Sequence, residues 1–250
     1  LNSTRKQYHK RIAQVLEKQF PETTETAPEL LAHHYTEANL YEQAINYWEQ
    51  AGKKAVGNSA NLEAIDHLRK GLKLLETFPD TPKRTEQELQ LQITLAVPLT
   101  ATSGYAASEV EQVYKRAYEL CRQIGEDAQH FPALYGMWRY HCLRAEYETA
   151  LKLGNELITL AENVKDRAFL IASHRALGST YFYLGQLSKS RLHLDHGIGS
   201  SVAEQGSATP FIKEAYDVID PHVTCRSYKS WVLWLLGYPD QALHESHEAI

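Results

Sequence analysis

A turn followed by the start of a helix recurs at five places in this chain of 250 residues. In each window the expected helix carries a small residue near its start. In most windows a large residue follows four positions later, and another small residue follows three beyond that. Side chains at these spacings share one helix face, so the small residues let a neighbouring helix approach closely. The small residues of the five windows are Ala44, Ala64, Ala150, Ser190 and Ala242.

A second helical stripe precedes several of the turns and is clearest at Leu177, Gly178 and Tyr181. Each unit is therefore a helix, a tight turn and a second helix. One such pair cannot bury both of its faces, so neighbouring pairs have to stack into an array. The pattern predicts an all-α protein with the architecture of an α-solenoid.

Two spacings depart from a regular repeat. Ala44 and Ala64 are 20 residues apart, which fits a helix from Tyr41 to Gly57 that closes one unit and opens the next. Ser190 and Ala242 are 52 residues apart. That interval contains the Gly, Ser and Pro residues of a long loop, expected over residues 198–220.

One segment, Leu89 to Val97, alternates apolar with polar or small residues as a strand does. It also supplies apolar pairs four residues apart and is rich in the helix formers Glu and Gln. We expect a helix, because no second strand-like run exists to pair with it. Pro98 and Gly104 are then expected to form a loop before a helix over residues 108–124.

The composition excludes several classes of protein. A formal net charge of -5 and an isoelectric point near 6.2 provide no broad basic field for nucleic acid. The most apolar run, residues 230–236, stops at Gly237, too short to cross a membrane. Three widely spaced cysteines form neither a disulfide framework nor a zinc signature, which fits a reducing cytoplasm.

Catalytic and metal-binding motifs are missing from the sequence. There is no G-x-x-x-x-G-K-[ST] phosphate loop and no G-x-S-x-G nucleophile motif. His193 with His196 and His244 with His247 share a helix face, but no third ligand lies nearby in sequence. We therefore expect structural or surface histidines, no cofactor, no metal and no enzymatic activity.

The motif around Leu177, Gly185 and Ser190, together with Gly237 to Ala242, resembles the tetratricopeptide repeat. A closer likeness is to the repeat region of bacterial STAND-type signalling ATPases, in which a class III adenylate/guanylate cyclase or another effector often precedes a predicted ATPase. The stretches that carry it are Tyr8–Ala13, Pro28–Tyr35, Gln50–Gly52, Gly104–Ala107, Arg175–Gly178 and Leu235–Ala242.

This resemblance implies a right-handed solenoid in two parts. Residues 1–25 would be the terminal helix of a preceding ATPase or winged-helix module, and residues 26–250 the repeat domain. The chain starts without methionine and stops inside a helical pattern, as expected of a piece of a longer protein. Gln241 to Ile250 would then be an open end that a crystal contact or a homodimer covers.

The resemblance also implies a ligand-binding concave face, lined by the first helix of each pair. Most of the aromatic rings are expected to fill gaps between helices, but aromatic and arginine side chains on that face suit peptide capture.

The leading hypothesis is a non-catalytic sensor that binds a protein or peptide and regulates an upstream ATPase. The alternatives are a small-molecule sensor with the 198–220 loop as a lid, and an intramolecular autoinhibitory clamp. The expected groove residues are Tyr135, Arg139, Arg175, Ser179, Phe182, Tyr183, Trp231 and Trp234.

Overall fold

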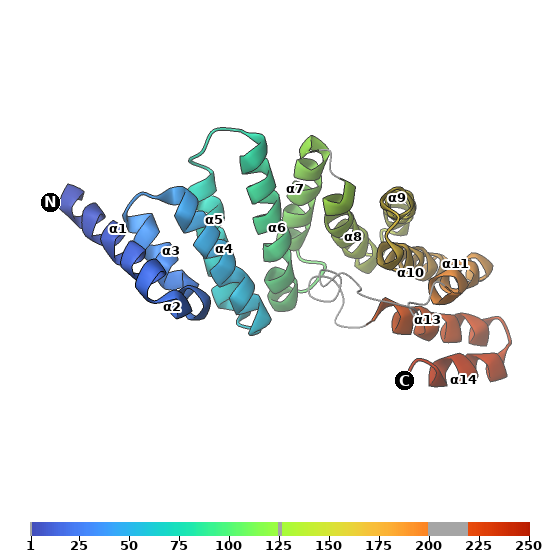
Figure 1. Cartoon of the computed structure of the whole chain (residues 1–250). Coiled ribbons are helices and arrows are strands. Elements are labelled where there is room, and N and C mark those ends of the chain that lie inside the picture. Colours follow the sequence, from blue (N-terminus) through green and yellow to red (C-terminus); the bar gives the residue numbers. More distant parts are fainter. Residues whose placement is uncertain (1, 125–126, 200–219) are drawn as a thin grey trace. The chain divides into compact units, whose positions relative to one another are not determined.

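The computed structural model describes residues 2–124, 127–199 and 220–250 (Figure 1). The described residues form helices joined by short turns, and none of them forms a strand. Most of the expected 198–220 loop, residues 200–219, lies outside the described residues. The chain divides into two compact units, residues 1–124 and residues 125–250.

The first unit is a series of helices, most of which pack mainly on their neighbours in sequence. Its described helices are α1 (Asn2–Gln19), α2 (Pro21–Thr26), α3 (Pro28–Glu37), α4 (Tyr41–Gly57), α5 (Asn61–Leu75), α6 (Pro82–Ser103) and α7 (Ser108–Ile124). Helix α4 packs against both α3 and α5, as expected for a helix shared by two units.

The second unit has the same organisation. Its described helices are α8 (Asp127–Leu143), α9 (Tyr147–Val164), α10 (Arg167–Tyr183), α11 (Leu187–Gly199), α13 (Pro221–Leu235) and α14 (Pro239–His247). Helix α10 is central, because it contacts α8, α9, α11 and α13 (Figure 1).

The five sequence windows fold into the same turn. In each, one residue adopts a left-handed conformation, with φ between 59° at Asn39 and 85° at Gly237. The next residue donates its backbone N–H to a carbonyl five positions earlier, over 2.9 Å in all five turns. This is the Schellman arrangement that ends a helix and satisfies its last carbonyls. The left-handed residues are Asn39, Ser59, Ala145, Gly185 and Gly237.

The small residues lie at the closest helix contacts. Ser190 is fully buried, and its hydroxyl donates to the Gly178 carbonyl over 2.7 Å. A Cβ added to Gly178 would lie 2.6 Å from a methyl group of Leu194. The sequence pattern therefore marks where α10 and α11 touch.

The segment from Leu89 to Val97 is helical, which confirms the prediction. The loop expected at Pro98 was wrong, because α6 continues through this proline to Ser103. Proline removes one helical hydrogen bond at a cost of about 3 kcal/mol. Here the flanking Leu95 and Leu99 are buried, and α6 packs against both α5 and α7, which offsets that cost. The helix ends at Gly104, where φ is 82°.

Helix α1 packs on the first repeat. Ala13 is fully buried in one cluster with Leu31 of α3. The Glu17 carboxylate accepts hydrogen bonds from Tyr35 over 2.7 Å and from Tyr47 over 2.6 Å. These contacts join α1 to α3 and α4. The assignment of residues 1–25 to the end of a preceding module stays a prediction.

Candidate functional site

The turns set a common register for α8, α10 and α13. The left-handed residues Ala145, Gly185 and Gly237 follow the ends of α8, α10 and α13, respectively. On each helix, the residues that lie 13, 10, 6, 3 and 2 positions before its left-handed residue are equivalent to those on the other two helices. We call these five positions on each helix the inner face. All eight residues expected in the groove lie on it.

Three of these eight residues, Phe182, Tyr183 and Trp231, belong to a continuous aromatic cluster that joins α10 to α13. The hydroxyl groups of Tyr183 and Tyr228 are hydrogen-bonded over 3.0 Å. The Tyr228 ring lies 5.0 Å from the Trp231 ring, and Phe182 lies 5.6 Å from Tyr228. Tyr147, at the start of α9, stacks in parallel on Tyr183 at 5.4 Å. The aromatic cluster is therefore Tyr147, Phe182, Tyr183, Tyr228 and Trp231.

One side of this cluster is open to solvent. Tyr183 is 45% exposed and Trp231 is 49% exposed. Trp234 follows one helical turn after Trp231 and is 66% exposed. Leu143 on α8 and Leu235 on α13, which occupy the position equivalent to Tyr183 on α10, are also exposed. Large exposed apolar side chains such as those of Tyr183 and Trp231, which belong to one cluster, are typical of a binding site.

Three of the expected groove residues are buried. The Arg175 guanidinium donates to the Tyr135 hydroxyl and lies 5.5 Å from the Trp138 ring. The Ser179 hydroxyl donates to the backbone carbonyl of Arg175 over 3.0 Å. Tyr135, Arg175 and Ser179 are therefore out of a ligand's reach, whereas a ligand could touch Phe182, Tyr183, Trp231 and Trp234. Arg139, on α8, is half-buried.

Sequence reasoning missed Tyr147 and Tyr228, which complete the cluster. Tyr228 precedes Trp231 by three residues, so the helical period alone could have placed it beside that ring. Burial raises the pKa of the Tyr228 hydroxyl above its usual range, and the hydrogen bond with Tyr183 raises it further. The hydroxyl therefore stays protonated and able to donate near neutral pH.

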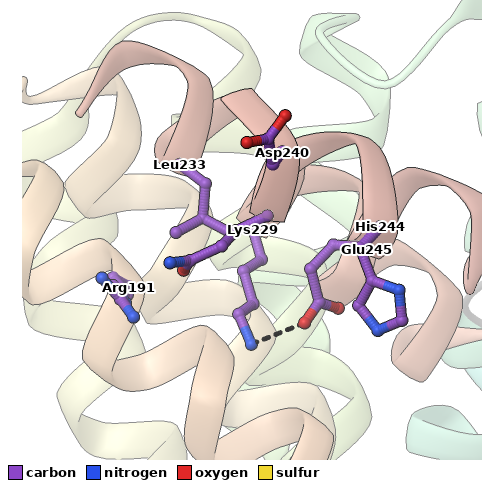
Figure 2. Close-up of a pocket in the computed structure, with 7 residues that line it drawn as sticks. Arg191, Lys229, Leu233, Asp240, His244 and Glu245 are labelled. Atoms are coloured by element: carbon purple, nitrogen blue, oxygen red, sulfur yellow. Dashed lines mark ion pairs between the residues drawn. The ribbon is translucent and has the colours of Figure 1, made fainter. Parts of the chain in front are cut away.

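A second candidate is an open charged pocket between α11, α13 and α14 (Figure 2). Lys229 lies between Glu245, at 2.8 Å, and Asp195, at 2.7 Å. Arg226 binds the other oxygen of Glu245 over 2.8 Å. Burial lowers the pKa of Lys229, but its two carboxylate partners outweigh this effect and raise it. These charges satisfy one another, so the network holds α14 and α11 on α13.

The structure also brings together histidines that are distant in sequence. His174 of α10 lies 5.4 Å from the His193 ring and 5.0 Å from the His196 ring of α11. Burial, together with the neighbouring His193 and His196, lowers the pKa of His174 to about 4. The described residues contain no group of three His, Cys, Asp or Glu side chains arranged to hold a metal ion.

The cysteines do not have the environment of catalytic nucleophiles. Cys121, Cys142 and Cys225 are all buried. Burial raises the pKa of Cys121 to about 12 and that of Cys142 to about 11, so these thiols stay protonated at neutral pH. No helix in the part of the chain that the structure describes is long and apolar enough to cross a membrane.

No protein-family model matches this sequence, and no curated protein matches it. Solved structures do match. The apo form of RapI has a TM-score of 0.66 at 14% identity, over 82% of this chain and 68% of that one. NprR in complex with its cognate peptide NprX has a TM-score of 0.59 at 13% identity, over 99% and 66%.

A third match is PH0952 from Pyrococcus horikoshii, a Signal Transduction ATPase with Numerous Domains (STAND) that has a tetratricopeptide repeat sensor. Its TM-score is 0.55 at 12% identity, and the match covers 96% of this chain but 45% of PH0952. At these identities the likeness concerns the fold. The chain has an all-helical solenoid fold of tetratricopeptide-like repeats, as the sequence predicted.

Proposed function

We propose that this chain is a non-catalytic sensor module that binds an extended peptide or protein segment on the inner face of residues 125–250. The aromatic cluster, with Trp234 beside it, is the observation that carries this proposal. Aromatic side chains dominate binding energy at protein interfaces, because they bury large areas at low conformational cost. The hydrogen bond between Tyr183 and Tyr228 and the contacts among the rings of the cluster hold these side chains in place, so little ordering is needed when a ligand binds.

The structural comparisons support the same role. NprR, whose structure contains its cognate peptide, has a related fold, and PH0952 uses tetratricopeptide repeats as a sensor. By this analogy the module reports ligand binding to an ATPase in the same polypeptide, with a nucleotide cyclase or another effector as the output. The proposal places the protein in the cytoplasm, where its three buried thiols stay reduced.

Selection of displayed random peptides on the 250-residue chain tests the proposal. Selected peptides are retested by the quenching of tryptophan fluorescence. Because interface hot spots are worth 2 kcal/mol or more, Trp234→Ala should weaken binding by about 30-fold. Leu192→Ala is the matched control, since Leu192 is an exposed apolar residue of α11 outside the inner face. Peptides that bind equally well to Trp231→Ala, Trp234→Ala and the unmodified chain would contradict the proposal.

A further inference from the structure

Helix α1 has two apolar faces. One of them packs on the first repeat, since Ala13 is fully buried there and Leu16 is half-buried against the same cluster. The other consists of Tyr8, Ile12 and Val15, which are 64%, 42% and 36% exposed. We call these three residues the outer stripe. One apolar face is enough to hold a helix on its own domain, so the outer stripe is available to a partner.

The spacing of the outer stripe is that of one helix of a coiled coil. Tyr8 and Ile12 are four residues apart, and Val15 follows three residues later. Side chains at alternating spacings of four and three form the seam along which two helices pack, the a and d positions of a heptad. With Ile12 at position a, the other two residues occupy position d. A second helix fits this seam better than an extended strand, because the backbone groups along α1 are already paired within the helix.

Two cations lie along one edge of the seam. Arg11 and Lys18 occupy successive g positions of the same heptad, and both residues are exposed. Neither side chain forms an ion pair or a hydrogen bond within the part of the chain that the structure describes. Charges at g positions determine which partner a coiled-coil helix accepts, because they face charged positions of the partner helix. This edge of the seam therefore favours a partner that carries carboxylates.

The carboxylates on and around α1 leave these two cations available. Residues 2–16 contain no Asp or Glu. The Glu17 carboxylate accepts hydrogen bonds from two tyrosines, and Glu37 of α3 pairs with Arg5. The other carboxylates of α2 and α3, which form no described ion pair with α1, are Glu22, Glu25 and Glu29.

We propose that the outer stripe docks an acidic helix of a partner protein, with apolar side chains against the stripe and carboxylates facing Arg11 and Lys18. A second copy of α1 is a poorer partner, because its own e and g positions contain no Asp or Glu. An anionic membrane is also a poorer partner, since the other apolar face of α1 packs on α3 and leaves a narrow stripe for insertion. This docking site is independent of the inner face and adds to the proposed function.

Two designed peptides of three heptads test the charge preference. Both have Leu at positions a and d, and they carry either Glu or Lys at positions e and g, so that like charges keep each peptide from pairing with itself. Binding to the 250-residue chain is followed by the fluorescence anisotropy of a label on the peptide. The Glu peptide should bind about tenfold more tightly than the Lys peptide at low ionic strength. Net charge cannot produce this preference, because the formal net charge of -5 favours the Lys peptide.

Variants of α1 assign the preference to the outer stripe. Ile12→Ser should weaken binding of the Glu peptide by about tenfold, because it removes the centre of the apolar row. Arg11→Glu should bring the affinities of the two peptides to within about twofold of each other. Lys10→Glu is the matched control, since it makes the same change in net charge at position f, opposite the seam. Lys10 lines an open pocket with Ala38 and Leu40, and its replacement should keep most of the preference. Circular dichroism checks that each variant keeps its helical content.

Four results would overturn the inference, and each leaves the proposed function standing. The first is equal binding of the two peptides, or no binding of the Glu peptide. The second is binding that Trp234→Ala abolishes and Ile12→Ser does not, which would place the peptide on the inner face. The third is self-association of the chain in sedimentation velocity that Ile12→Ser abolishes, which would assign the stripe to a second copy. The fourth is Ile12-dependent binding to phosphatidylserine vesicles, which would assign it to a membrane.

Discussion

The hydroxyl oxygens of Tyr183 on α10 and Tyr228 on α13 lie 3.0 Å apart, and this hydrogen bond joins two neighbouring repeats at the edge of the aromatic cluster. Tyr183 is 45% exposed, so its hydroxyl can bind water if its partner is removed. Tyr228→Phe should therefore lower the free energy of unfolding by about 0.5–1.5 kcal/mol, the net value of one such bond. Urea denaturation of Tyr228→Phe, Tyr183→Phe and the double variant measures the coupling. Additive effects of the two single changes would show that the bond contributes nothing.

Gly178 lies at a close contact between α10 and α11. A Cβ there would meet the Leu194 side chain at 2.6 Å, so Gly178→Ala should destabilise the protein by about 1–3 kcal/mol through overpacking. Gly199→Ala is the control, because nothing lies within 4 Å of its added Cβ. Thermal denaturation should show a clear loss for the first variant and little change for the second. Equal melting temperatures would contradict the close packing of these helices.

The left-handed turn residues should respond to substitution in opposite directions. Gly185 has φ of 71° and open space around its missing side chain, so Gly185→Ala should cost about 1–2 kcal/mol in backbone strain alone. Ala145 adopts φ of 60° in the equivalent turn. Ala145→Gly should relieve that strain, offset in part by the greater freedom of glycine in the unfolded chain, for a net gain of about 0.5 kcal/mol. Denaturation midpoints that fall for both variants would contradict this account of the turns.

The histidine cluster of α10 and α11 should make stability depend on pH. Burial, reinforced by His193 and His196, lowers the pKa of His174 to about 4 in the folded protein. Burial and His196 also lower the pKa of His193. The unfolded chain has ordinary histidine pKa values near 6.5, so it binds more protons as the pH falls below that value. The free energy of unfolding should therefore be highest above about pH 6.5 and should decrease progressively as the pH falls toward 4.

Urea midpoints measured across this pH range test the effect. The surroundings of the cluster include Tyr181, which stacks on His193, and Lys189, which lies over the Tyr181 ring. His174→Asn should flatten the slope relative to the unmodified chain. An unchanged slope would mean that the cluster does not cause the pH dependence.

The repeat architecture could be predicted from the sequence because it depends on local signals. Ala44, Ala64, Ala150, Ser190 and Ala242 are all buried, as their helical spacing indicated. Asn39 and Ser59 show that the turn forms without glycine, because its hydrogen bonds come from the backbone. A continuous helix through Pro98 could not be predicted, since it depends on how α6 packs against α7.

The candidate site was predicted in part. The helical phase placed Tyr183, Trp231 and Trp234 on the inner face, and all three are exposed. The helical phase could not distinguish the exposed residues of the inner face from its buried residues, because the burial of Arg175 and Ser179 depends on neighbouring helices. The meeting of His174 with His193 and His196 also depends on how α10 packs against α11.

The most direct test of the account is to locate a bound peptide on the chain. A selected peptide with one photo-reactive side chain is cross-linked to the 250-residue protein, and the modified residues are identified by mass spectrometry. The account predicts cross-links at Tyr183, Trp231 and Trp234, and their loss when an excess of unlabelled peptide competes. Cross-links confined to residues 1–124, or to α9, α11 and α14, would contradict binding on the inner face.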